Sequence, residues 1–254
     1  MVQKIMVDSF TKLELNYTGS LLVKGVGHIR CPTTNEIVEA GGEDVYNWRI
    51  GMLLYTKSQL ADNLNIELTP DVVEELNSTP LFLFLVAQQD FRNAIAEALS
   101  FFLDERLVFD EPSASFLTLR PGADDIVGNI NCSNYEQVRD LILQRNYISL
   151  PKEGVVKKKS KKELEREAKI ATGRKRSKKY KDRQDAMRLD NVTSKLAARS
   201  HSMNIQDVYN LTVYQLYDQF NEINMSLQID TILTRWSVWG KDDFDFSVWC
   251  RPNE

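Results

Sequence analysis

Positive charge is concentrated in one stretch of this 254-residue chain, and that stretch limits how the chain can fold. From Lys152 to Arg188 there are sixteen Lys/Arg and six Asp/Glu. Both flanks are acidic, because residues 1–151 carry 11 basic and 21 acidic side chains and residues 189–254 carry five and nine. So charged a stretch, with few apolar residues, cannot bury enough surface to offset the chain entropy lost on folding. The pattern predicts two folded acidic parts joined by a basic segment.

We therefore expect three units along the chain. Residues 1–150 form an N-terminal domain, residues 151–203 a basic and flexible linker, and residues 204–254 a small, mainly α-helical C-terminal module. The hydrophobic content of 43% is sufficient for a core on either side of the linker. The central cations of the linker are Lys157, Lys158, Lys159, Lys161, Lys162, Arg174, Lys175, Arg176, Lys178 and Lys179.

The first 150 residues predict a helix-dominated α+β domain. A β-rich stretch at 20–31 contains Gly25 and Gly27 and predicts a strand or a hairpin. Thr33 and Glu36 have the spacing of a capping box at a helix start. We then expect helix to Leu60 with a break near Gly41-Gly42, helix from Pro70 and one helix over 79–104. After these come a hairpin over 106–110 and 115–120, a strand at 126–131 and a helix over 134–145.

The C-terminal part predicts a long amphipathic helix followed by an aromatic tail. Thr212 and Gln215 fit a helix cap, and Gly240 fits a helix stop. The apolar residues of the expected face recur every three to four positions: Val213, Leu216, Tyr217, Phe220, Ile223 and Leu227, with continuation to Trp236. So much aromatic surface needs cover, either inside the module or from a partner. The candidate partner-binding residues are Tyr214, Tyr217, Phe220, Trp236, Trp239, Phe244, Phe246 and Trp249.

The residues that catalysis or metal binding requires are sparse. His28 and Cys31 are close in sequence without a second ligand pair, so a buried Cys beside a surface His is the better interpretation. Asp242, Asp243 and Asp245 lack the spacing of a calcium loop, and no nucleotide-binding or hydrolase motif is present. We expect no catalytic residues, no metal and no cofactor. No apolar run approaches the length of a membrane span and the N-terminus has no signal-peptide pattern, so we expect a cytosolic protein.

Two stretches resemble the tail assembly chaperones of long-tailed bacteriophages. The run from Gly25 to Ile37, with Tyr46 following, is similar to the entry segment of members from Gram-positive hosts. The run from Asn210 to Asp218, within the pattern L-T-V-Y-Q-L-Y-D-x-F, is the more specific signal. Together they cover about a tenth of the chain.

The resemblance implies a non-enzymatic role in the host cytoplasm. In that family the N-terminal domain coats the tape measure protein, and the C-terminal domain recruits tail tube subunits. Self-association is a further expectation. Two alternatives remain open. The basic segment at 152–188 suits nucleic-acid binding, because its cations can neutralise phosphates. A structural component of the virion, with the basic segment between acidic neighbours, is the other alternative.

Overall fold

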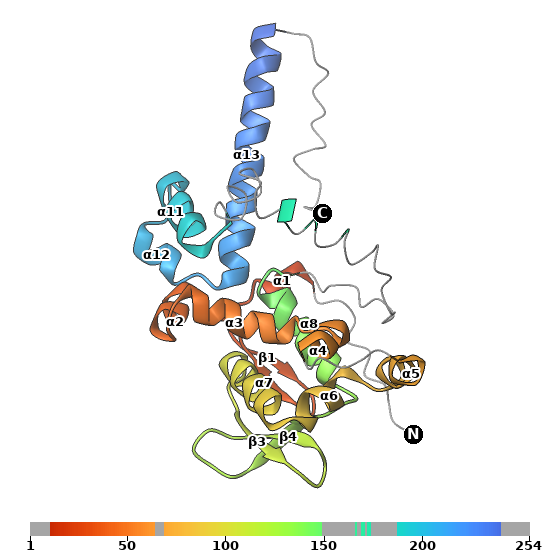
Figure 1. Ribbon diagram of the computed structural model, residues 1–254. Coiled ribbons are helices and arrows are strands. Elements are labelled where there is room, and N and C mark those ends of the chain that lie inside the picture. Colours follow the sequence, from red (N-terminus) through yellow and green to blue (C-terminus); the bar gives the residue numbers. More distant parts are fainter. Residues whose placement is uncertain are drawn as a thin grey trace.

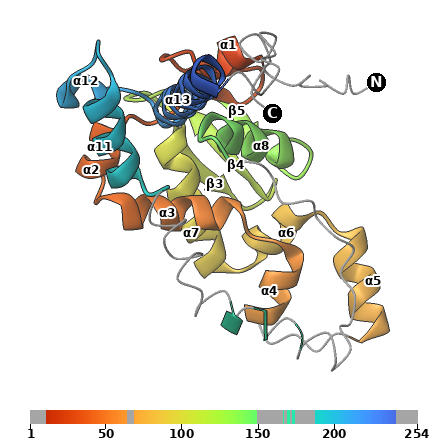
Figure 2. The ribbon, with the colours of Figure 1, turned by 90° about the horizontal axis from the view of Figure 1, so that it is seen from above.

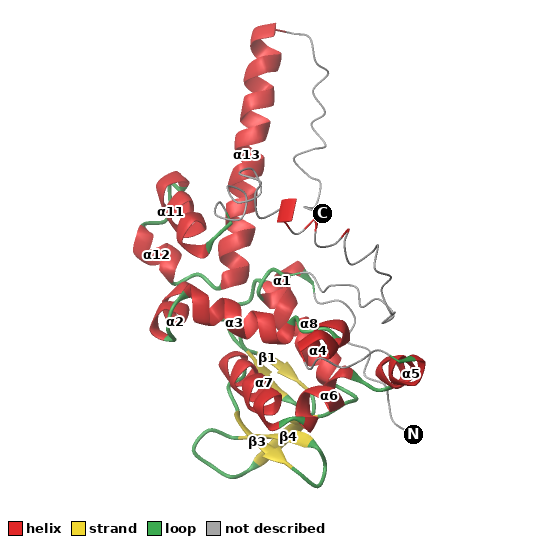
Figure 3. Ribbon diagram, viewed as in Figure 1, coloured by secondary structure: helices red, strands yellow, loops and turns green. Residues whose placement is uncertain are grey.

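The computed structural model describes residues 11–63, 69–148, 166, 169–170, 172–173 and 187–239, and the fold is a mixture of helices and small sheets (Figure 3). This confirms the predicted α+β class with its helical C-terminal region. None of the helices in these ranges is both long and apolar enough to cross a bilayer. The chain begins with α1 (Lys12–Leu15) and the antiparallel hairpin of β1 (Leu21–Val23) and β2 (Gly27–Ile29), which confirms the predicted hairpin.

Three helices follow the hairpin. They are α2 (Thr34–Glu39), α3 (Glu43–Leu53) and α4 (Lys57–Asn63). The sequence predicted helix over this stretch with one break near Gly41-Gly42, so the second break, between α3 and α4, was not predicted. Gly41 and Gly42 separate α2 from α3 with φ angles of 109° and 88°, a region that side chains with a Cβ rarely adopt. The predicted break is therefore confirmed. α5 (Pro70–Ser78) begins after Thr69, whose side chain accepts from the Val72 N–H.

The prediction of one helix over 79–104 was wrong. The chain forms α6 (Leu81–Ala87) and α7 (Gln89–Phe102), because Gln88 is extended, with φ −102° and ψ 130°. In a single straight helix, Leu85 and Ile95 would point about 80° apart. The break allows both to face the core, where each is fully buried.

A three-stranded antiparallel sheet follows α7. Its strands are β3 (Arg106–Asp110), β4 (Ser115–Leu119) and β5 (Ile126–Ile130), with β4 in the middle. α8 (Tyr135–Arg145) then packs against the core, as the sequence predicted. α7 and α8 both lie on the core side of this sheet, because Tyr135 of α8 and Phe116 of β4 both pack on the Phe82 ring. Figure 2 shows α8 beside β4 and β5, and α7 beside β3.

Three helices form the C-terminal part: α11 (Leu189–Arg199), α12 (Ile205–Tyr209) and α13 (Val213–Trp239). α11 differs from the expected linker over 151–203, because residues 189–199 are helical and bury Leu189, Val192 and Leu196. The sequence did not predict this helix, because its few apolar residues stand in a stretch that is otherwise polar. The boundaries at 150 and 203 otherwise stay predictions.

One hydrophobic core joins the two ends of the chain. It includes Ile29, Phe102 and Ile142 from the first 148 residues and Val192 and Leu216 from the C-terminal helices, all fully buried. A second, small cluster lies apart from this core and contains Ala61 and Leu76. From the main core α13 projects as a single long helix (Figure 1).

Candidate protein-interaction surface

The start of α13 is fixed to the loop between β2 and α2. The Val213 N–H donates to the Pro32 carbonyl at 3.0 Å, and the Thr34 N–H donates to the Leu211 carbonyl at 3.3 Å. The predicted cap is confirmed, because the Gln215 N–H donates to Thr212 Oγ1 and the Thr212 N–H donates to Gln215 Oε1. α13 therefore begins at a defined point on the body of the molecule.

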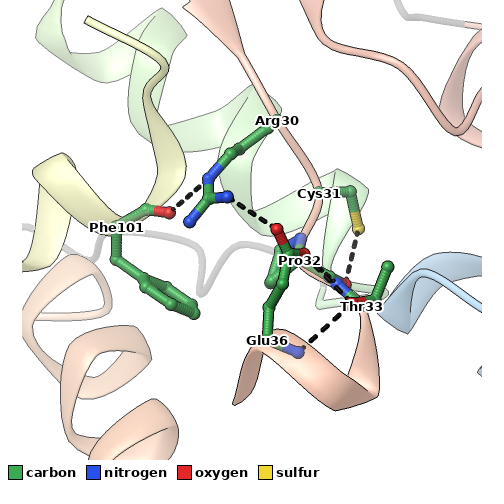
Figure 4. Close-up of polar contacts among 6 residues, drawn as sticks. All are labelled: Arg30, Cys31, Pro32, Thr33, Glu36 and Phe101. Atoms are coloured by element: carbon green, nitrogen blue, oxygen red, sulfur yellow. Dashed lines mark hydrogen bonds and ion pairs between the residues drawn. The ribbon is translucent and has the colours of Figure 1, made fainter. Parts of the chain in front are cut away.

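The loop that holds α13 is itself rigidly bonded (Figure 4). The Glu36 N–H donates to Thr33 Oγ1 at 3.2 Å and the Thr33 N–H to Glu36 Oε2 at 2.7 Å, which confirms the predicted capping box. Arg30 donates from Nη1 to Glu36 Oε1 at 2.8 Å and from Nε to the Phe101 carbonyl at 2.9 Å. The loop thus connects α2 and α7 to the base of α13.

An ion-pair cluster from α1 forms a second attachment. Lys12 Nζ lies 2.8 Å from Asp218 Oδ1 and 2.8 Å from Glu222 Oε1. Asn16 donates to Asp218 Oδ2 at 3.2 Å, and Gln215 donates to the Asn16 carbonyl at 2.8 Å. The hydrogen bond that Lys12 donates to Asp218 is the main cause of the raised pKa of the Lys12 amine. α1 therefore fastens one side of α13 to the N-terminal part.

Aromatic rings form a third attachment. The Tyr147 ring lies 5.3 Å from the Tyr214 ring and 5.8 Å from the Tyr217 ring, and its hydroxyl accepts from Asn221 Nδ2. The Tyr217 hydroxyl donates to the Met187 carbonyl at 2.8 Å, just before α11. Burial raises the pKa of Tyr217 to about 12, with a smaller contribution from the charge of Glu43.

The far half of α13 carries exposed apolar side chains. Leu227, Ile232, Trp236 and Val238 are exposed, with Trp236 at 45%, whereas Ile229 in the same half is buried. Figure 1 shows this half extending beyond α11, α12 and the rest of the described body. Exposed tryptophan and aliphatic side chains on a rigid helix suit protein recognition rather than chemistry. We call residues 227–239 the arm.

The structure separates the predicted partner-binding residues into three groups. Tyr214, Tyr217 and Phe220 pack within the molecule at the base of α13. Trp236 lies exposed on the arm, and Trp239 ends α13. Outside the described residues lie Phe244, Phe246 and Trp249, together with all ten central cations, Lys157, Lys158, Lys159, Lys161, Lys162, Arg174, Lys175, Arg176, Lys178 and Lys179.

Sequence reasoning missed the residues that hold α13 from the other side. Lys12, Asn16 and Tyr147 are more than 60 residues away in the chain, and no local pattern indicates that they meet α13. Asp218 was the one residue that could have indicated these contacts. It is a carboxylate next to the apolar face of a predicted helix, and in the structure it is buried, where a charged group requires a partner.

The histidine and cysteine near the hairpin have structural partners. His28 Nδ1 lies 2.8 Å from Glu105 Oε1, and the His28 N–H donates to the same carboxylate. Cys31 is buried, as predicted, and burial raises the pKa of its thiol. Within the described ranges, no group of three or more His, Cys, Asp or Glu residues is placed to hold a metal ion. Asp242, Asp243 and Asp245 lie outside those ranges.

Comparison with known families finds one similarity, which lies in the C-terminal part. Residues 177–252 match the family model described as the YomV second domain. YomV is a phage-associated protein, so this range is similar to a domain of a phage-associated family. The match encloses α11, α12 and α13. We found no match among curated proteins and none among solved structures.

Proposed function

We propose that this protein is a non-enzymatic tail assembly chaperone of a bacteriophage, acting in the host cytoplasm. It binds the tape measure protein through the N-terminal part and recruits tail tube subunits through the arm. The observation that carries the proposal is the arm itself, because Ile232 and Trp236 are exposed on a helix whose other end is firmly held. An interface built on such a helix needs little additional ordering on binding.

Two further observations support this proposal. The phage-associated family match spans the arm, which agrees with a phage context for the C-terminal part. Tyr214, Tyr217 and Phe220 already have intramolecular partners, so the proposed contact with tube subunits moves from the base of α13 to the arm. Aromatic and aliphatic residues at the centre of an interface usually contribute most of its binding energy.

The test is a co-expression pull-down of the full chain with the tape measure and tail tube proteins encoded by the same phage. We expect the chain to capture both proteins. The double substitution Ile232→Ala and Trp236→Ala should abolish capture of the tube protein and leave capture of the tape measure protein intact. Val38→Ala is the matched control, because Val38 is an exposed apolar residue on α2.

Three outcomes would contradict the proposal. Capture of neither protein would remove the chaperone function. Loss of both partners in the arm variant would show that the arm does not discriminate between them. Presence of the chain in purified, mature particles would instead favour a structural virion component.

The charge of residues 152–188 favours nucleic-acid binding as a second candidate function. Sixteen cations in 37 residues can displace counterions from several phosphates, which makes binding strongly salt-dependent. Retention of the full chain on DNA that falls steeply with added salt, and that is lost when residues 152–188 are deleted, would support this function.

A further inference from the structure

The two edges of the three-stranded sheet have different surroundings. On one side, the turn between β1 and β2 meets β5, because the Asn129 N–H donates to the Gly25 carbonyl at 2.9 Å. The approach is so close that a Cβ at Gly128 would lie 2.2 Å from the Gly25 oxygen. β5 is therefore covered by the chain itself.

The other edge of the sheet is β3. In the part of the chain that the structure describes, β3 pairs with β4 and has no strand on its outer side. An open edge presents unpaired N–H and C=O groups, and proteins usually protect it with charged side chains, a proline, a bulge or a covering segment. β3 has no proline and no bulge, its charged residues stand only at its two ends, and its central residue, Val108, is 39% exposed.

The sequence of β3 is complementary to itself in the antiparallel direction. It reads Arg106-Leu107-Val108-Phe109-Asp110, with opposite charges at its two ends and apolar residues between them. When two such strands are centred on Val108, Arg106 lies opposite the partner's Asp110, and Leu107 lies opposite the partner's Phe109. Opposite charges and apolar pairs are the favourable cross-strand combinations.

We propose that two copies of this chain associate through antiparallel pairing of their β3 strands. The result is a continuous six-stranded sheet with a twofold axis at Val108, which is the usual symmetry of a homodimer. A parallel arrangement is disfavoured, because it would set Arg106 beside the partner's Arg106 and Asp110 beside the partner's Asp110.

The outer face of the sheet extends the complementary surface. Phe116 and Thr118 of β4 face the core, and the Thr118 hydroxyl donates to the Val26 carbonyl at 2.5 Å. Leu117 alternates with them and pairs with Val108 on the outer face. Because Val108 lies at the twofold axis, pairing of two copies brings the Val108 and Leu117 side chains of both copies next to each other.

Arg106 can supply its charge to this contact at little cost. Its present partner is Asp124, at 2.8 Å, whose side chain is almost fully exposed. An ion pair at such a position contributes little to folding stability. Exchange of Asp124 for the partner's Asp110 therefore leaves the fold of each copy unchanged.

The test is the mass of the full chain, measured by sedimentation over a concentration series. We expect a monomer–dimer equilibrium that Val108→Lys weakens at least tenfold, because it places two lysines together at the twofold axis. Val127→Lys is the matched control: Val127 has the same residue type and a nearly equal exposure of 38%, but it lies on β5. That variant should dimerise like the unsubstituted chain.

A charge exchange tests the direction of pairing. Arg106→Glu should weaken the dimer, since it faces the partner's Asp110. The double substitution Arg106→Asp and Asp110→Arg should restore it. A monomer at every concentration would overturn the proposal, and so would a dimer that tolerates Val108→Lys. Circular dichroism of each variant excludes loss of fold as the cause. None of these outcomes depends on the proposed function.

Discussion

At the scale of single residues, Arg145 holds together parts of the chain that are far apart in sequence. Its guanidinium is fully buried and donates to three carbonyls, those of Ile29 at 2.6 Å, Tyr17 at 2.6 Å and Gly19 at 2.9 Å. Burial lowers the pKa of this guanidinium, and the three oxygens compensate for part of the lost hydration. The contacts fix the segment between α1 and β1.

We therefore expect Arg145→Met to destabilise the protein strongly. The substitution keeps much of the side-chain volume but leaves three carbonyl oxygens without their donor, at a cost of about 2–4 kcal/mol in the free energy of unfolding. Urea unfolding followed by circular dichroism measures this change. Arg120→Met is the control, because Arg120 is exposed and its removal should change the stability by less than about 0.5 kcal/mol. Equal effects of both substitutions would contradict this role of Arg145.

Tyr217 predicts a loss of stability at alkaline pH. Its pKa is raised to about 12 in the folded protein, from an ordinary value of 10.0, so the unfolded chain loses this proton first. The stability that depends on protonated Tyr217 is complete below about pH 10 and disappears as the pH rises to about 12. Over this range the free energy of unfolding falls by at most about 1.4 kcal/mol per pH unit. Urea unfolding at several pH values should show a flatter decline in Tyr217→Phe. An unchanged slope in this variant would contradict the prediction.

The sequence predicted local contacts well and distant ones poorly. Thr33 with Glu36 and Thr212 with Gln215 were found because both members of each pair lie within one turn of helix. Arg145 was the last residue of a predicted helix, and the sequence analysis made no prediction about its side chain. Nothing within its own helix indicates that its partners lie more than 100 residues earlier.

At the scale of elements, α13 shows why one apolar face was predicted where two exist. Leu216, Phe220 and Ile223 follow a three-to-four-residue spacing and pack against the core. Ile232 follows Leu227 by five residues, which turns it about 140° around the helix. Trp236 lies on the same side as Ile232, whereas Val238 lies within about 20° of Leu227. The arm therefore carries apolar residues on two sides, and the sequence correctly predicted the length of the helix but not the second side.

Because the base of α13 is buried and Ile232 is exposed, similar substitutions along α13 should change the free energy of unfolding by different amounts. Leu216→Ala removes a fully buried side chain and should lower the free energy of unfolding by about 3 kcal/mol. Ile232→Ala removes an exposed side chain and should change it by less than about 0.5 kcal/mol. Chemical denaturation of the two variants under the same conditions provides the comparison. A large loss with Ile232→Ala would show that the arm is covered by other parts of the chain.

At the scale of the whole molecule, the C-terminal helices complete the core of the N-terminal part. Charge distribution predicted two folded parts, but it contains no information about how they pack. The structure joins them through the Val213–Pro32 hydrogen bond, the Lys12–Asp218 ion pair and the burial of Leu216 in the main core. A partner that binds the C-terminal helices therefore binds a folded unit that also contains the N-terminal part.

A shared core predicts that a substitution in α13 weakens α7. Leu99 of α7 and Leu216 of α13 are both fully buried in the same cluster, so their backbone amides should exchange through the same global opening. Leu216→Ala should then accelerate hydrogen exchange at both positions, on the order of a hundredfold for a loss of about 3 kcal/mol. Ile232→Ala, which lies on the arm, should leave both rates unchanged. If Leu216→Ala accelerated exchange in α13 alone, the C-terminal helices would be an independent unit, and binding at the arm would have no route to the N-terminal part.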